Sequence, residues 1–253
     1  MKKLLIHILE NAYESQEGHV PSSLSILDIL WVLYSKILNI DPKNPTDPNR
    51  DFFILSKGHA ALGLYSVLAE RGFFTPSEMK KFCRYDSKLG GHPNRIKVCG
   101  VEASTGSLGH GFPIAVGIAK GLKIQKKKQR VFVLIGDGES NEGTIWESAL
   151  LAVHHKLDNL CCIIDHNHST DRALDLQNLE NKFASFGWQS LTVDGHDQKQ
   201  VEKALKTKHS GIPLAIIANT IKGRGISSLE NNPAWHHKSP NKEEFETLMK
   251  EIA

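Results

Sequence analysis

The sequence predicts an α/β fold, a doubly wound and mostly parallel sheet flanked by helices on both faces. Two observations lead to this prediction. Continuous apolar runs, typical of strands buried on both faces, recur in the second half of the chain, and stretches with helical periodicity separate them. The chain has 253 residues, of which 40% are hydrophobic and 23% are charged, and this is enough for one large domain with a substantial core. We therefore expect a single domain over residues 1–253.

The first part of the chain, to about residue 127, reads as helices joined by loops. Leu24–Leu38 is apolar on nearly every side, so we expect it to be buried in the core or to face another subunit. A loop rich in Pro, Asn and Asp follows over Asp41–Arg50, and the short apolar run Phe52–Leu55 is a candidate strand. Helical periodicity also predicts helices over Lys2–Tyr13, His59–Arg71 and Leu108–Gln125.

The second part alternates strands with helices. The expected strands are Val131–Ile135, Leu160–Asp165, Gln189–Val193 and Pro213–Ile221. The expected helices are Asn141–Leu157, Leu179–Phe186, Gln198–Lys206 and Lys242–Ile252. Ligands of such sheets bind beyond the carboxyl ends of the strands. The first two of these strands end in polar residues, Gly136-Asp137-Gly138 and Asp165-His166-Asn167, so we look for the site there.

Composition excludes several classes of protein. The net charge of +3 is too small to indicate nucleic-acid binding, and the basic run Lys126–Arg130 suits the solvated end of a helix. None of the four cysteines forms a CxxC pair, which is typical of a reducing compartment. The N-terminal segment lacks a signal-peptide cleavage site, and the longest apolar segment is too short to span a bilayer. We expect a cytoplasmic protein without a membrane partner.

Asp137 lies between two glycines at a strand end, where backbone N–H groups can approach a phosphate closely. A carboxylate repels a phosphate unless a cation lies between them, so the motif suggests a metal-bridged diphosphate. Asn167 follows the next strand, and its side chain would lie beside Asp137. With a backbone carbonyl, two diphosphate oxygens and a water, these two residues would complete the six oxygen ligands that Mg²⁺ prefers. Taken alone, a Gly-Asp-Gly sequence is more often a plain turn.

The pattern of Asp137 and Asn167 resembles the metal–diphosphate signature of thiamine-diphosphate enzymes. A wider set of motifs, in order along the chain from about residue 10 to 240, is similar to the N-terminal domain of transketolases. The set consists of Gly18-His19, Lys57-Gly58-His59, Gly91-His92-Pro93, Thr105 to Gly111, Gly136-Asp137-Gly138, Glu142-Gly143 and Trp235-His236.

The resemblance implies a domain of the thiamine-diphosphate-binding type, which holds the diphosphate of that cofactor on Mg²⁺, with Ca²⁺ or Mn²⁺ as alternatives. It implies that Asp137, Asn167 and the backbone carbonyl of Ser169 are the metal ligands. The implied cofactor contacts are His59, Gly106, Ser107, Leu108, Gly138, Glu139, Asn167, Ile221 and His236. The implied catalytic residues are His19, His59, His92 and His236, together with Glu142 in a contact that links paired sites.

The expected chemistry explains the histidines. A transketolase transfers a two-carbon ketol unit from a ketose to an aldose, and protons leave and join oxygen atoms on the way. Imidazole titrates near neutrality and can serve both steps. His237 adjoins His236, so either could be the active-site histidine. A lone histidine is more often a core or surface residue than a catalyst, so we interpret the remaining histidines in that way: His7, His154, His155, His166, His168, His196 and His209. The absence of an HExxH motif disfavours a zinc enzyme.

A complete transketolase also has a pyrimidine-binding and a C-terminal domain, and the first of these supplies the glutamate that activates the cofactor. This chain matches neither domain, so the resemblance implies a partner subunit, an α2β2 heterotetramer and no activity of the chain alone. Leu24–Leu38 and Thr144–Val153 are candidate interface helices, or core. Sugar phosphates of the pentose phosphate type are the default substrates, with sulfonated or unmodified sugars left open. The alternatives are the α subunit of a 2-oxo acid dehydrogenase and a non-catalytic cofactor-binding or regulatory module.

Overall fold

The computed structural model describes residues 1–171 and 173–252, and its centre is a five-stranded sheet in the order β1-β2-β3-β5-β4. All four strand pairings are parallel. The strands are β1 (Phe52–Leu55), β2 (Val131–Gly136), β3 (Leu160–His166), β4 (Gln189–Asp194) and β5 (Leu214–Asn219). The predicted parallel sheet is therefore confirmed, and the short apolar run at Phe52 is one of its edge strands.

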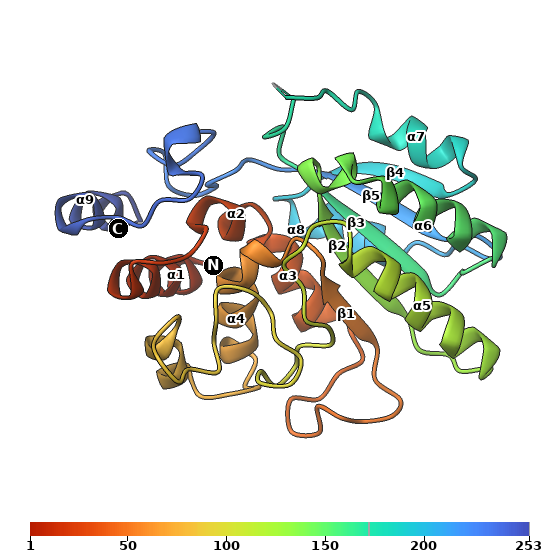
Figure 1. Ribbon diagram of the computed structural model, residues 1–253, viewed down its shortest axis with the longest axis horizontal. Helices are drawn as coiled ribbons and strands as arrows, with labels where there is room; N and C mark the ends of the chain where they lie inside the picture. Colours follow the sequence, from red (N-terminus) through yellow and green to blue (C-terminus); the bar gives the residue numbers. More distant parts are fainter. Residues whose placement is uncertain (172, 253) are drawn as a thin grey trace.

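Helices cover both faces of the sheet (Figure 1). One layer contains α5 (Gly111–Ile124), α6 (Gly143–His154) and α7 (Leu179–Ser185), and the other contains α2 (Val20–Ser25), α3 (Leu27–Val32), α4 (Ala61–Glu70) and α8 (Gln198–Leu205). The side chains of β2 alternate between the layers, because successive residues of a strand point to opposite faces. Val133 and Ile135 pack under α5 and α6, whereas Phe132 and Leu134 join the core on the other side.

The remaining elements are short or lie at the ends of the chain. They are α1 (Lys2–Ser15), the π-helix η1 (Leu33–Ile37), the 3-10 helices η2 (Gly58–Ala60), η3 (Pro76–Lys81), η4 (Gly138–Asn141) and η5 (Pro233–Trp235), and α9 (Lys242–Ile252). Helices α1 and α9 lie side by side at one end of the molecule (Figure 1), where the rings of Tyr13 and Phe245 stack with centroids 4.4 Å apart. The predicted C-terminal helix is confirmed.

The apolar stretch Leu24–Leu38 is not the single helix that its periodicity predicts. Pro21 lies in the first turn of α2, where its fixed φ suits a helix start. Ile26 then leaves helical geometry with φ −106° and ψ 3°, and α3 and η1 follow as separate turns. Leu30 and Leu33 are fully buried within the chain, so this stretch is core rather than a subunit interface.

Two of the four cysteines act as small buried apolar side chains, as predicted, whereas Cys83 is partly buried and Cys99 is exposed. All four are free thiols, and neighbouring Cys161 and Cys162 of β3 are buried in the two different cores. Among the described residues, no helix has the length and apolar character needed to cross a bilayer.

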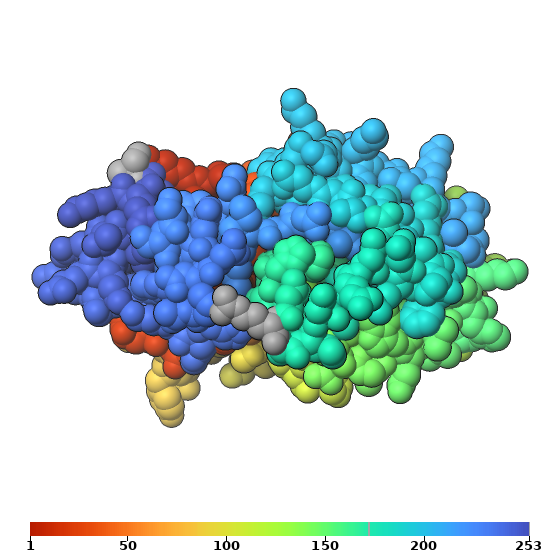
Figure 2. All heavy atoms as spheres, turned by 90° about the horizontal axis from the view of Figure 1, so that it is seen from above, coloured from red at the N-terminus to blue at the C-terminus, as the bar shows by residue number. Residues whose placement is uncertain are grey.

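The strand ends that the sequence singled out meet at one edge of the sheet. Gly136 pairs with Asp165, and His166 pairs with Asn219, so β2, β3 and β5 end at the same level. The loops that follow these strands form the face seen in Figure 2, where the C-terminal segment in blue lies beside the green and teal segments that follow β2 and β3.

Candidate active site

Two side-chain oxygen atoms that could bind a metal ion converge beyond the ends of β2 and β3. The Oδ2 atom of Asp137 and the Oδ1 atom of Asn167 both accept a hydrogen bond from the backbone N–H of Ser169, each at 3.1 Å. Asp137 also accepts from the Gly138 N–H at 2.7 Å and from the Ser169 hydroxyl at 3.3 Å. Both side chains are buried. The structure thus brings together the two side chains that the sequence predicted to meet.

A buried network fixes the orientation of the Asn167 amide. The Nδ2 group of Asn167 donates to Asp165 at 2.8 Å, which leaves the amide oxygen to face the strand-end loops. Asp165 is fully buried and also accepts from the Lys57 ammonium, the Thr220 hydroxyl and, at 2.8 Å, the Ser25 hydroxyl. These supporting residues were not predicted from the sequence. The signal was present, because Asp165 is a charged residue at the end of a buried apolar strand.

The electrostatics of Asp137 suit a bound cation. Burial raises the pKa of this carboxyl group, and the negative charge of Asp165 raises it further. The hydrogen bond from the Gly138 N–H and the charge of Lys57 lower the pKa by less. Burial would also raise the pKa of Asp165, but the charge and hydrogen bond of Lys57 lower it, so Asp165 stays ionised. A divalent cation beside Asp137 would offset the burial of its negative charge. The donor set of a carboxylate and an amide oxygen fits a hard cation such as Mg²⁺.

Histidines from distant parts of the chain form a cluster. The ring of His19, at the start of α2, has its centroid 5.2 Å from that of His59 and 4.4 Å from that of His237. The His236 ring is farther, at 6.1 Å, and its Nδ1 atom lies 3.0 Å from the ammonium group of Lys222. His236 therefore faces Lys222, while His237 packs on His19. The two adjacent histidines, which the sequence could not distinguish, thus have different surroundings.

Three imidazoles of this cluster have lowered pKa values. Burial is the main reason that the pKa of His19 falls from 6.5 to about 4, and the neighbouring His237 and His236 lower it further. Burial, followed by the charge of Lys57, also lowers the pKa of His59, and burial followed by Lys222 lowers that of His236. These imidazoles are uncharged at neutral pH and can accept protons, and the nearby ammonium groups favour an anionic ligand.

The predicted glycine-rich segment lies against the same cluster. A Cβ atom on Gly58 would come within 2.9 Å of the backbone nitrogen of Gly106, so only a glycine lets η2 approach this segment. A Cβ atom on Gly106 would in turn meet the imidazole of His92 at 3.0 Å. His92 is thereby next to the segment that contains Ser107 and Leu108, although its side chain is exposed.

A cleft of about 470 Å³ lies between the loop after β3 and the segment after β5. Its walls contain four of the residues expected in the site, and the two halves of the wall come from the teal and blue segments of Figure 2. These four residues are Asn167, Ser169, Ile221 and His236, and Thr220 and Lys222 also line the cleft. Lys222 is a further site residue that was not predicted from the sequence, and its position just after a strand end was the available signal.

Ile221 is held by a histidine that we interpreted from the sequence as structural. The Nε2 atom of His196 accepts a hydrogen bond from the Ile221 N–H at 2.8 Å, and its Nδ1 atom lies 3.3 Å from a carboxylate oxygen of Asp28. An imidazole that accepts at Nε2 donates at Nδ1, so Asp28 fixes the tautomer. This pair anchors the backbone of the cleft wall.

Two glutamates of the expected site have different surroundings. The buried carboxylate of Glu139 accepts from the Ser56 hydroxyl, from the Gly109 N–H at 2.9 Å and from the Gly136 N–H at 3.2 Å. Its oxygens thus hold the loop before α5 onto β2, and the contact of Glu139 with the cofactor stays a prediction. Glu142 is exposed and occupies the N-cap position of α6, where its side chain makes no capping hydrogen bond.

Fold and site together define a class of protein: a parallel α/β domain whose strand-end loops bring together side-chain oxygens that fit a hard cation, a cluster of histidines and a cleft. A family model described as "Transketolase, thiamine diphosphate binding domain" matches residues 2–252. The chain belongs to the transketolase family and represents its thiamine-diphosphate-binding domain. The expected cofactor, thiamine diphosphate, follows from this membership.

Individual relatives support the assignment. The chain is 42% identical to one of the apulose-4-phosphate transketolase subunits of Actinobacillus succinogenes over 97% of this chain and 91% of that protein. It is 37% identical to a 6-deoxy-6-sulfo-D-fructose transketolase subunit from a Clostridium species, over 93% of this chain and 88% of that protein. The crystal structure of transketolase from Campylobacter jejuni superimposes with a TM-score of 0.89 at 33% identity, covering 99% of this chain. The chain spans only 41% of that transketolase.

Proposed function

We propose that this chain is the diphosphate-binding subunit of a two-subunit transketolase, which transfers a two-carbon ketol unit from a ketose phosphate to an aldose phosphate. The observation that carries the proposal is the convergence of Asp137 and Asn167 on the Ser169 N–H beside a cluster of neutral histidines. Two relatives named as single subunits of apulose-4-phosphate transketolases, matched over 91% and 90% of their lengths, support the division into subunits. They favour a transketolase over a 2-oxo acid dehydrogenase.

The metal and the diphosphate are proposed to bind at the strand ends. Asp137, Asn167 and the backbone carbonyl of Ser169 would hold Mg²⁺, because their oxygens are the ligands that this ion prefers. The Gly138 N–H and the imidazoles of His59 and His236 would contact the diphosphate. The Nζ atom of Lys222 lies 3.0 Å from Nδ1 of His236, so this ammonium group would add a positive charge near the diphosphate.

The histidines are proposed to manage protons. The bound cofactor supplies an electron sink for cleavage of the carbon–carbon bond. His19, His59, His92 and His236 would hold or accept protons at hydroxyl and carbonyl oxygens of the sugars. The lowered pKa values of His19, His59 and His236 keep these three imidazoles unprotonated at neutral pH. Ile221 would pack near the thiazolium ring. Gly106, Ser107 and Leu108 would lie beside the aminopyrimidine ring.

A partner subunit is proposed to complete the site. The pyrimidine-binding and C-terminal domains would belong to that subunit, and residues 1–253 would form a single domain. Two of each subunit would form an α2β2 heterotetramer in the cytoplasm, with Glu142 in the contact that links paired sites. Helix α6 is a candidate interface, because it exposes Leu150 and Leu151 at 53% and 51%.

Substrate choice is the most direct test of the proposed reaction. The mixed subunits, with thiamine diphosphate and Mg²⁺, should transfer a ketol unit to ribose 5-phosphate from a phosphorylated ketose. Xylulose 5-phosphate, apulose 4-phosphate and 6-deoxy-6-sulfo-D-fructose are the donors to compare, the last two because relatives are named for them. Product formation is followed by mass spectrometry. Turnover with a phosphorylated ketose is the expected result.

Two other outcomes would contradict this proposal. Decarboxylation of a 2-oxo acid, without ketol transfer, would indicate part of a 2-oxo acid dehydrogenase. An assembled pair that binds thiamine diphosphate and acts on none of these compounds would indicate a non-catalytic module.

A further inference from the structure

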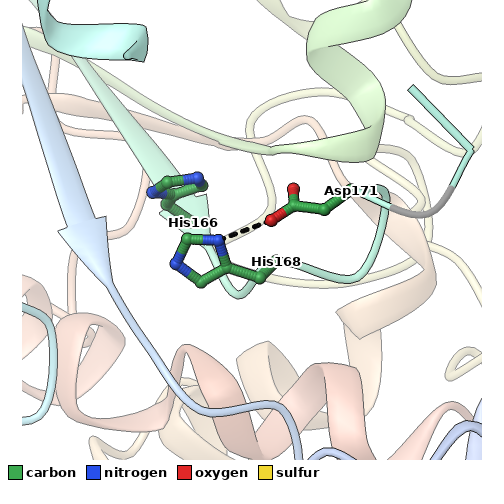
Figure 3. Close-up of side chains that lie close together, drawn as sticks. All are labelled: His166, His168 and Asp171. Carbon is green, nitrogen blue, oxygen red and sulfur yellow. Dashed lines mark hydrogen bonds and ion pairs between the residues drawn. The ribbon is translucent and has the colours of Figure 1, made fainter. Parts of the chain in front are cut away.

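A second group of potential metal ligands lies outside the proposed magnesium site. His166 is the last residue of β3, and His168 and Asp171 follow in the next loop. Each residue offers one donor atom, and these three atoms lie within 4.8 Å of one another. Figure 3 shows the two imidazole rings facing each other with the carboxylate beside them. Among the described residues, no other group of three His, Cys, Asp or Glu side chains meets this criterion.

Hydrogen bonds leave both imidazoles ready to bind a metal. The Nδ1 atom of His168 lies 2.8 Å from a carboxylate oxygen of Asp171, and the Nδ1 atom of His166 lies 3.1 Å from the amide oxygen of Asn219. The Asn219 oxygen is an acceptor, so Nδ1 of His166 carries the proton and its Nε2 keeps its lone pair. Metal-binding histidines in proteins are oriented in this manner by a carboxylate or carbonyl on the other ring nitrogen. Nδ1 of His168 faces the Asp171 carboxylate, and a divalent ion that displaces the proton between them would bind both groups.

The donor set selects the kind of ion. Imidazole nitrogens suit zinc and other divalent transition metals, whereas Mg²⁺ prefers oxygen ligands. In a tetrahedral zinc site with bonds of about 2.0–2.1 Å, the ligand atoms lie roughly 3.3 Å apart. In the observed group the donor atoms lie within 4.8 Å of one another, and the His168 Nδ1 and Asp171 oxygen atoms are 2.8 Å apart. The side chains of His168 and Asp171 are 56% and 38% exposed, so they are free to adjust to an ion. Three protein ligands would leave a fourth position for water.

We propose that His166, His168 and Asp171 form a binding site for a divalent transition-metal ion of the zinc class, separate from the proposed magnesium ligands. Asn167 lies between the two histidines in sequence, and His168 also lines the 470 Å³ cleft. An ion at this site would therefore restrain the loop at the mouth of the cleft. The proposal does not depend on the transketolase reaction, because it rests on side chains that the reaction does not use.

Zinc binding to the purified chain tests the proposal. A chromogenic chelator competes for Zn²⁺ while an excess of Mg²⁺ occupies hard-cation sites, and absorption bands of bound Co²⁺ report the geometry. We expect one zinc ion per chain, with affinity at least about tenfold lower in His168→Ala and in Asp171→Asn. Both side chains are exposed, so neither variant should change the circular dichroism of the fold.

Matched variants separate this site from other histidines. The double variant His154→Ala/His155→Ala removes a neighbouring pair from the surface of α6, with ring centroids 4.9 Å apart, and should leave the affinity unchanged. His237→Ala tests the cluster around His19 and should also have no effect. Unchanged zinc affinity in both His168→Ala and Asp171→Asn would overturn the proposal. So would a loss confined to His237→Ala, because it would place the ion in the histidine cluster.

Discussion

Replacement of Asp137 by alanine should prevent loading of thiamine diphosphate onto the assembled enzyme. The carboxylate is the one anionic ligand that the protein is proposed to supply to the metal, and it lies beside the Asn167 oxygen and the Ser169 N–H. Loss of a residue that only orients a metal ligand typically costs 10–100-fold in metal affinity. Loss of the ligand itself should therefore weaken metal-dependent cofactor binding by at least about 100-fold. Isothermal titration of the mixed subunits with cofactor and Mg²⁺ measures the effect.

A second aspartate provides the control for this experiment. Asp158 lies just before β3, at the amino-terminal ends of the strands and thus opposite the proposed site. It forms an exposed ion pair with Lys123 at 2.7 Å. Asp158→Ala should leave cofactor affinity within about twofold of the parent, because exposed pairs contribute at most about 1 kcal/mol. Equal cofactor affinity in the Asp137→Ala enzyme and its parent would show that the metal binds elsewhere.

Replacement of Lys57 by methionine should strongly destabilise the domain. Lys57 and Asp165 form an ion pair whose side chains are 2% and 0% exposed. Removal of one partner leaves a buried charge without compensation, which costs about 3–5 kcal/mol. The expected result is a fall of this size in the free energy of unfolding, measured by urea denaturation. Asn167 should also lose its orientation, because its amide donates to the same carboxylate.

Two further variants distinguish the buried charge from a general effect of losing a lysine. Lys36→Met removes an exposed pair with Glu202 and should change stability by at most about 1 kcal/mol. The double variant Lys57→Met/Asp165→Asn should recover part of the lost stability, because the unpaired charge is gone. Equal small losses in Lys57→Met and Lys36→Met would contradict the assigned role of the buried pair.

The fold was predictable because its central strands β2, β3 and β5 are buried on both faces. Continuous apolar runs such as Val131–Ile135 can only be parallel strands covered by helices, or buried helix, and their length and spacing favoured strands. Periodicity failed at Leu24–Leu38 because an all-apolar stretch does not reveal where the backbone turns. Ile26 departs from helical geometry between α2 and α3, which both pack on α4, and the π-helix that follows α3 packs on α8.

The site was predictable where residue type and strand ends agreed. Asp137 and Asn167 follow adjacent strands, so their meeting followed from topology. The supporting residues were not predictable in the same way. Lys57 and His196 contact the site through single hydrogen bonds to residues 108 and 25 positions away, and no local pattern encodes such pairings.

The central claim is that this chain supplies the metal and diphosphate half of a site that a partner subunit completes. The most direct measurement is ketol transfer from xylulose 5-phosphate to ribose 5-phosphate, with thiamine diphosphate and Mg²⁺, by the chain alone and by the chain with its candidate partner. We expect no turnover above background from the chain alone, activity from the mixed subunits, and loss of that activity in Asp137→Ala. Ketol transfer by the purified chain alone, or by the mixture containing Asp137→Ala at the parental rate, would contradict the account.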